Sequence, residues 1–272
     1  MEPAFEEINP QPLPPPSTDA AISELRTIHA LAPAWHTIVL IVFIAAISIA
    51  GSIQAVRPQP VHNRFATYAA TAVMEMLMLV WVVWGLRLRR LPLRTLFGEL
   101  PLGARAFFAD FGVALLFWIG ALMVLGTVGM MWSGIQALAK HGAVPLTPAR
   151  SEASRALMQV APSNLREGVA WAFLCLLVGI VEESVFRGYF QGQFTLWARG
   201  NAILGVVFSA VLFGAAHGYQ GLRSMVLLVV FGALFSLLSI ARRSLRPCIF
   251  AHAWHDLIAG VVLGIMRVNH LL

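Results

Sequence analysis

Ionisable side chains occur inside three apolar stretches in the C-terminal half of this 272-residue chain. The first group is the segment EESVFR at residues 182–187, which follows the apolar run AWAFLCLLVGIV. On a helix, Glu183 and Arg187 share one face, and glutamate before arginine is the favourable order for an ion pair. Glu182 points about 100° away from Glu183. We therefore expect Glu183 to neutralise Arg187 and Glu182 to stay free for chemistry; the alternative is a structural ion network of all three.

Histidines form the other two groups. Phe213 and His217 are four residues apart at the end of one apolar run, and the small residues between them allow close helix packing. His252 and Asp256 share a helix face in a later run, with His255 beside them. Asp256 can orient the His252 ring, as carboxylates often do. Two plainer readings stay open: His217 hydrogen-bonds only a backbone carbonyl, or the residues around His252 form a polar seam between helices.

The three groups together favour a hydrolytic site. An ionisable residue at the centre of a membrane helix costs about 2.5–3.5 kcal/mol, so such residues persist where they have a function. Three successive apolar stretches each contribute a group that can transfer protons or bind a metal. The ordered motifs EExxxR, FxxxH and HxxxD resemble those of the CAAX prenyl endopeptidase and bacteriocin-processing membrane proteases. This family, also called CPBP or Abi, includes the Ras-converting endopeptidase, and the resemblance covers roughly residues 167–266.

The resemblance implies a role for each motif residue. Glu182 would act as general base, together with His217, on a hydrolytic water. His252 would steady the oxyanion with the residue four positions later, Asp256. The supporting residues would be Glu183, Arg187, Phe213 and Asp256. The site can close only if the helix that begins near residue 167 runs past Arg187 to about Phe194, because neighbouring membrane helices are antiparallel.

Two features of the site stay open at this stage. The family typically has asparagine where this chain has Asp256, and an ionised carboxylate cannot donate a hydrogen bond to an oxyanion. Asp256 is therefore either protonated in a low-dielectric setting or only orients His252. Glu182, His217 and His252 are also a candidate His₂Glu zinc set with an open water position. We favour glutamate-dependent hydrolysis without a tightly bound cofactor, and zinc is the alternative.

The composition requires a membrane to surround these groups. The chain is 58% hydrophobic and 12% charged, whereas soluble domains carry about 25% charged residues. A spanning helix needs about 20 apolar residues, which predicts an all-α, polytopic transmembrane bundle. The seven expected spans are residues 35–56, 65–86, 106–135, 167–190, 202–217, 222–241 and 247–266. Residues 147–158 predict a short interfacial helix. The acidic, proline-rich residues 1–33 predict a disordered tail before a membrane domain over residues 34–272.

Charge distribution predicts the orientation and excludes nucleic acid as a partner. Arginines cluster after the second expected span, at residues 87–105, and before the seventh, at residues 242–246. Cytoplasmic loops are rich in Arg and Lys, so we expect the N-terminus to lie in the cytoplasm. The expected location of the protein is a bacterial plasma membrane. No basic stripe of a nucleic-acid-binding fold is present. Glu75, a single acid in the second span, can cap a cavity or pair with an arginine, and we expect structural pairing.

These observations predict an intramembrane endopeptidase that cleaves a membrane-anchored peptide or protein at the lipid bilayer. A prenylated substrate is not implied by any residue pattern. One rival is a proton-coupled transporter, which relays protons through intramembrane Glu and His but predicts inverted repeats and broken helices that the sequence lacks. The other rival is a non-catalytic membrane scaffold.

Overall fold

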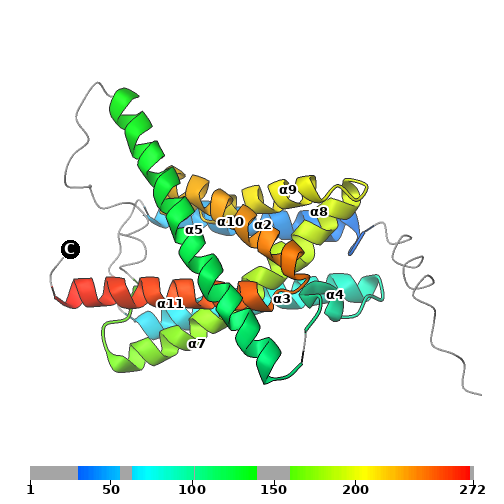
Figure 1. Ribbon diagram of the computed structural model, residues 1–272, viewed down its shortest axis with the longest axis horizontal. Coiled ribbons are helices and arrows are strands. Elements are labelled where there is room, and N and C mark those ends of the chain that lie inside the picture. Colours follow the sequence, from blue (N-terminus) through cyan, green and yellow to red (C-terminus); the bar gives the residue numbers. More distant parts are fainter. Residues whose placement is uncertain (1–29, 56–62, 101, 140–159, 270–272) are drawn as a thin grey trace, which may run out of the picture.

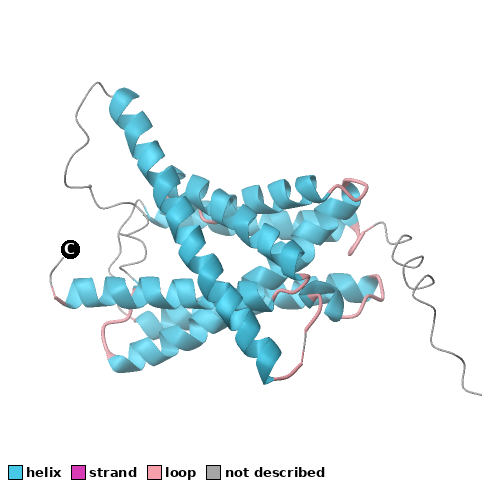
Figure 2. Cartoon of the chain, viewed as in Figure 1, coloured by secondary structure: helices cyan, strands magenta, loops and turns pink. Residues whose placement is uncertain are grey.

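The described part of the protein is a bundle of helices. The computed structural model describes residues 30–55, 63–100, 102–139 and 160–269. Within these ranges the regular structure is helical, apart from one isolated antiparallel bridge between Gly98 and Ser244 (Figure 2). The predicted all-α class is therefore confirmed. The predicted interfacial helix at residues 147–158 and residues 1–29 of the predicted tail lie outside the described residues.

The helices match the expected apolar runs closely. In chain order they are α2 (Ala34–Ala55), α3 (Arg64–Leu88), α4 (Arg94–Phe97), α5 (Ala104–Ala139), α7 (Leu165–Glu182), η1 (Glu183–Phe190), α8 (Gln191–Trp197), α9 (Ala202–Ala216), η2 (Gly218–Gln220), α10 (Leu222–Arg242) and α11 (Arg246–Val268). Among the described residues, six helical stretches are long and apolar enough to cross a membrane. α9 is apolar but has 15 residues, which is about 22 Å of helix and less than the bilayer core. The protein is thus a multi-pass integral membrane protein.

Asparagine residues define where three of these helices begin. The side chain of Asn63 accepts a hydrogen bond from the Ala66 amide at the start of α3. Asn164 and Asn201 cap α7 and α9 in the same way. A side-chain oxygen at this position satisfies backbone N–H groups that have no partner within the helix. The caps therefore explain why helices begin at these points within long apolar sequence.

The helix that carries the first motif is long, as the site requires. α7, η1 and α8 follow one another without interruption, from Leu165 to Trp197. The prediction that this helix runs past Arg187 to about Phe194 is confirmed, and the helix ends at Trp197. Its central segment η1 is a π-helix, a wider form that is frequent at functional sites. The hydroxyl of Ser184 donates to the carbonyl of Ile180 at 2.6 Å where the widening begins.

Packing places the long helix at the centre of the bundle. α11 and α3 both pack along α7, and α10 packs along α9. In Figure 1, α7 and α11 run together, and α5 crosses the bundle obliquely. Large apolar side chains such as Leu116 and Phe173 point outward and are more than two-thirds exposed, which suits a lipid surface. The charged motif residues are inside.

Two further contacts lie at one end of the membrane domain. Leu31 and Ala32 are buried, and the fully buried side chain of Gln193 bonds the amides of both residues. The fold therefore begins slightly before the predicted tail boundary at residue 33, because these backbone groups find a partner on α8. At the same end, the Glu99 amide donates to the Arg243 carbonyl at 2.8 Å. This contact places the two arginine-rich connections side by side.

Candidate active site

The first motif forms a buried ion pair on η1. Arg187 Nη1 lies 3.0 Å from Glu183 Oε1, and the side chains of the two residues are 1% and 0% exposed. The guanidinium also stacks over the rings of Phe213 and Phe235, with its carbon 4.3 and 5.0 Å from their centroids. A buried charge is tolerated only when it is paired and hydrogen-bonded. The pairing expected from the four-residue spacing is therefore present in the structure.

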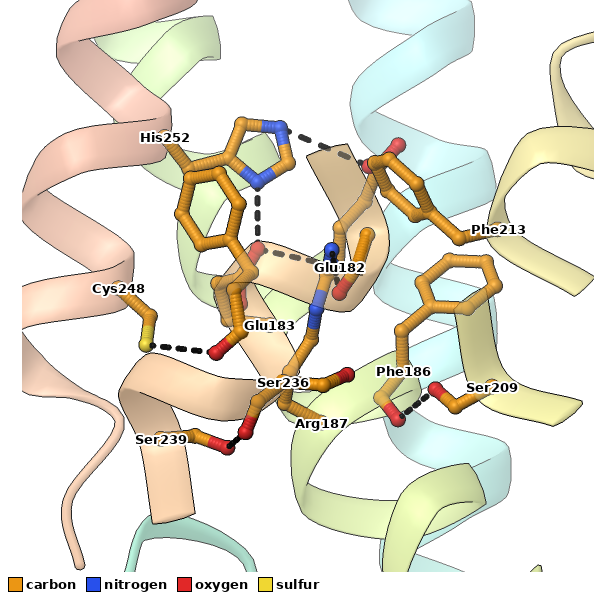
Figure 3. A network of polar contacts seen from close by, with 12 residues as sticks. Glu182, Glu183, Phe186, Arg187, Ser209, Phe213, Ser236, Ser239, Cys248 and His252 are labelled. Carbon is orange, nitrogen blue, oxygen red and sulfur yellow. Dashed lines mark hydrogen bonds and ion pairs between the residues drawn. The ribbon is translucent and has the colours of Figure 1, made fainter. Parts of the chain in front are cut away.

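His252 on α11 makes its short contact with the same glutamate. Its Nδ1 lies 2.7 Å from Glu183 Oε1 (Figure 3). Because an ionised carboxylate only accepts, Nδ1 carries the proton and donates. Nε2 then faces two further carboxylates, with Glu182 Oε2 and Asp256 Oδ2 each 3.6 Å away. Glu183, rather than Asp256, is thus the carboxylate that orients the ring; Asp256 faces the opposite nitrogen.

Glu182 is the carboxylate of the first motif without a short partner. It is the last residue of α7 and is 9% exposed. Its Oε2 is buried and has no hydrogen-bond partner among the described residues. The neighbouring residue Glu183 engages both Arg187 and His252. Rotation by one helical residue therefore separates two carboxylates with different contacts: Figure 3 shows Glu183 joined to both Arg187 and His252, and Glu182 joined only by the longer 3.6 Å contact with His252.

His217 follows the end of α9 and keeps one ring nitrogen available. Its Nδ1 lies 2.8 Å from the carbonyl oxygen of Phe213. A carbonyl only accepts, so Nδ1 carries a proton and the neutral ring has its lone pair on Nε2. The hydrogen bond to a backbone carbonyl, considered as the plainer reading, is thus present without occupying the second nitrogen.

The short length of α9 brings His217 toward the depth of Glu182. α9 packs antiparallel to α8 and η1, and the Ser209 hydroxyl donates to the Phe186 carbonyl at 2.7 Å. One turn further along α9, Phe213 contacts Phe186 and Arg187. Continuing this register by one more turn places His217 near the level of Glu182. The helix ends inside the bundle, which resolves the opposite-face difficulty of antiparallel neighbours.

The described residues do not form a metal-binding set. No group of three His, Cys, Asp or Glu side chains within the described ranges is arranged to hold a metal ion. The candidate zinc ligands Glu182, His217 and His252 are all described, so the donor geometry does not fit the zinc alternative. What the arrangement offers is acid–base groups and hydrogen-bond donors.

Glu75 on α3 differs from the sequence expectation. The expected ion pair with an arginine is not found among the described residues, and Glu75 Oε2 is buried without a hydrogen-bond partner. The side chain instead interacts electrostatically with Glu182, His252 and Asp256. Glu75 is absent from the site predicted from the sequence because structural pairing with an arginine was expected. The available signal was a lone acid in an otherwise apolar span.

Comparison with known proteins agrees with the motifs. Residues 164–258 match the family model described as type II CAAX prenyl endopeptidase Rce1-like. The matched segment contains all three motifs and extends from the N-terminal end of α7 into α11. The resemblance to the CPBP and CAAX protease family is thereby confirmed, while α2, α3 and α5 lie outside the match. Searches among curated proteins and among solved structures found no significant match.

Proposed function

Since residues 164–258 of this chain match the family model of the type II CAAX prenyl endopeptidase Rce1-like proteins, we propose that the protein is an intramembrane endopeptidase. It hydrolyses a peptide bond of a membrane-associated peptide or protein. One observation carries the proposal: the uncommitted carboxylate of Glu182 lies beside His252, whose other nitrogen is held by Glu183. At one buried point, the carboxylate can act as the base of a hydrolytic reaction, and the imidazole can stabilise the negative charge that develops in it.

Glu182 activates the water in this mechanism. Its carboxylate accepts a proton as the water oxygen attacks the peptide carbonyl carbon, and Nε2 of His217 provides a second acceptor to hold that water. A positioned base of this kind contributes about 10²- to 10⁴-fold in rate. The low water content of a buried site strengthens these interactions.

His252 stabilises the oxyanion. In its doubly protonated form the ring donates from Nε2 to the developing negative charge, while Nδ1 stays bound to Glu183. One such donor is worth about 2.7–4 kcal/mol in the transition state. Asp256 in its ionised form cannot donate. Its carboxylate, 3.6 Å from Nε2, serves to favour the charged ring.

An apolar hollow next to His217 supports a lipid-anchored substrate. The hollow has a volume of about 360 Å³ and is lined mainly by residues of α2 and α9, such as Ser48 and Ala215, and also by Gly218 of η2. Gly218 directly follows His217 in the chain. A lipid or prenyl chain lying there would bring an attached peptide to the polar groups. The family name makes a prenylated CAAX peptide the first substrate to test.

The proposed orientation puts the N-terminus in the cytoplasm. Arg89 and Arg243 belong to connections that the contact between Glu99 and Arg243 holds at one end of the bundle. Loops rich in Arg face the cytoplasm. Ala32, which lies just before α2, exchanges two hydrogen bonds with Gln193 of α8 at the same end.

Hydrolysis by the full chain, reconstituted in liposomes, tests the proposal. The probes are a quenched fluorescent farnesylated CAAX peptide and the same peptide carrying a palmitoyl anchor. We expect Glu182→Gln to lower the cleavage rate at least about 10²-fold. Glu167→Gln, which changes a buried acid bound to Arg64 and Ser163, is the matched control and should retain cleavage. Equal rates for Glu182→Gln and wild type would refute the role of Glu182.

A further inference from the structure

Glu75 is a buried acid without a counterion, and it lies outside the segment that matches the protease family. It stands near the middle of α3 and is 7% exposed. Its Oε2 is buried, and among the described residues it has no hydrogen-bond partner and no ion pair within 4.0 Å. An ionised carboxylate left unpaired in an apolar interior costs several kcal/mol. Such a residue needs a reason to be there.

Helix packing directs Glu75 toward the motif residues. α3 runs along α7 and η1, and the ring of Tyr68 lies 5.6 Å from the ring of Trp171. Further along, Val82 and Val185 belong to one buried cluster, so the two helices are parallel. The same register places Glu75 level with Val178, which is one helical turn before Glu182 at the end of α7. Consistently, the charges that act on it are those of Glu182, His252 and Asp256.

The charges at this point do not balance if every acid is ionised. Glu183 and Arg187 neutralise each other. His252 can supply one positive charge to the remaining carboxylates, and it lies 3.6 Å from both Glu182 and Asp256. Glu75 has no such contact. Carboxylates that share one site cannot all ionise, so the acid without a cationic contact is the one that keeps its proton.

Other groups near Glu75 do not change this balance. Tyr219 interacts electrostatically with Glu75, Glu182 and Asp256, and burial raises the pKa of Tyr219 to about 12. Its hydroxyl therefore stays neutral at physiological pH and supplies no positive charge. His217 interacts with Asp256, which already faces His252. The proton thus remains with Glu75.

We propose that Glu75 is a further acid–base residue of this site, the carboxyl group that protonates the leaving amine; this inference rests on the proposed function. As Glu182 accepts one proton from the attacking water, Glu75 delivers its own proton to the amide nitrogen. The C–N bond then breaks and yields a neutral amine and a carboxylic acid. The proton on Glu182 afterwards returns through water to Glu75, so both carboxyl groups are restored. The active site therefore extends beyond the matched domain onto α3.

A comparison of amide and ester cleavage tests this role in the full reconstituted chain. The probes are the farnesylated CAAX peptide and the same peptide with an aryl ester at the scissile position. A phenol has a pKa near 10, so the phenolate leaves without prior protonation. We expect Glu75→Gln to lower amide cleavage about 10²-fold or more and ester cleavage less than about threefold. Glu75→Asp should recover part of the amide activity, and Glu182→Gln should lower both rates.

Four outcomes would overturn the proposal. Equal loss on amide and ester would assign Glu75 a structural role, and unchanged amide cleavage would remove it from the mechanism; in both cases the protease function stands. If the wild type cleaves neither probe, the proposed function fails and this inference fails with it.

A measurement without substrate tests whether Glu75 carries a proton. Infrared spectra should show a protonated carboxyl band that Glu75→Gln removes and Glu167→Gln keeps. Absence of that band also refutes the proposal.

Discussion

Replacing Glu183 by glutamine should destabilise the fold more than replacing its partner Arg187 by methionine. The two side chains form an almost fully buried ion pair at 3.0 Å. The two side chains differ in the contacts that each would keep after the other is replaced. Without Arg187, Glu183 keeps the hydrogen bond from His252 Nδ1 at 2.7 Å. Without the Glu183 carboxylate, Arg187 keeps a 3.5 Å contact with the Gly232 carbonyl and two aromatic faces.

The magnitudes follow from this difference. Removal of one partner from a buried pair costs about 3–5 kcal/mol, because an uncompensated charge stays in the interior. Arginine cannot release its proton, so Glu183→Gln carries this full cost. In Arg187→Met, His252 can take up the balancing charge, and we expect about 1–3 kcal/mol. The double variant leaves no unpaired charge and should be more stable than Glu183→Gln alone, with a coupling of about 2 kcal/mol.

Reversible unfolding in mixed micelles measures these free energies. The four proteins of the double-mutant cycle are compared under one detergent composition, and Gly168→Ala serves as a control on the same helix run. The explanation is wrong if Arg187→Met costs as much as Glu183→Gln, or if the two changes are additive. Either result would mean that His252 does not compensate Glu183, and the hydrogen bond to its Nδ1 would then not carry the stabilisation assigned to it.

Two further predictions concern helix packing and orientation. Gly179→Ala should lower the free energy of unfolding by about 1–3 kcal/mol and lower the cleavage rate, because the added Cβ would lie 3.0 Å from the Ala253 amide nitrogen on α11 and force apart the helices that carry Glu182 and His252. In the control Gly168→Ala the added Cβ meets nothing within 4 Å, so stability and cleavage should not change. Equal effects of the two changes in unfolding and cleavage assays would contradict this explanation. In intact cells, a cysteine from Arg89→Cys should be protected from a membrane-impermeant thiol reagent, and labelling from outside would show the opposite orientation.

Several features of this protein follow from local sequence. Apolar runs of about 20 residues predict membrane helices because the bilayer core demands that length. Six of the seven expected spans correspond to described helices long enough to cross a membrane, whereas residues 202–217 form the shorter helix α9. The pairing of Glu183 with Arg187 is likewise predictable, since residues four apart on a helix are neighbours in any fold. The extension of the helix past Arg187 to about Phe194 follows from requiring that the motifs meet, and the observed end is Trp197.

The tertiary structure decides which groups on different helices face each other. Spacing within α11 suggested Asp256 as the group that orients His252, but packing against α7 brings Glu183 to Nδ1 at 2.7 Å. Glu75 belongs to no motif and joins the site only because α3 packs beside α7. Rotation and register between helices depend on the summed packing of many side chains, which no local pattern encodes.

The presence of charged groups inside apolar helices and their mutual arrangement thus have different determinants. The sequence by itself determined that this is a membrane protein whose motifs carry buried acids, an arginine and histidines, because composition and helical periodicity act locally. Only the three-dimensional packing decided that Glu183 is committed to Arg187 and His252, that Glu182 is left without a short partner, and that Glu75 faces the same point. These assignments depend on distances across helices, and such distances exist only once the bundle has formed.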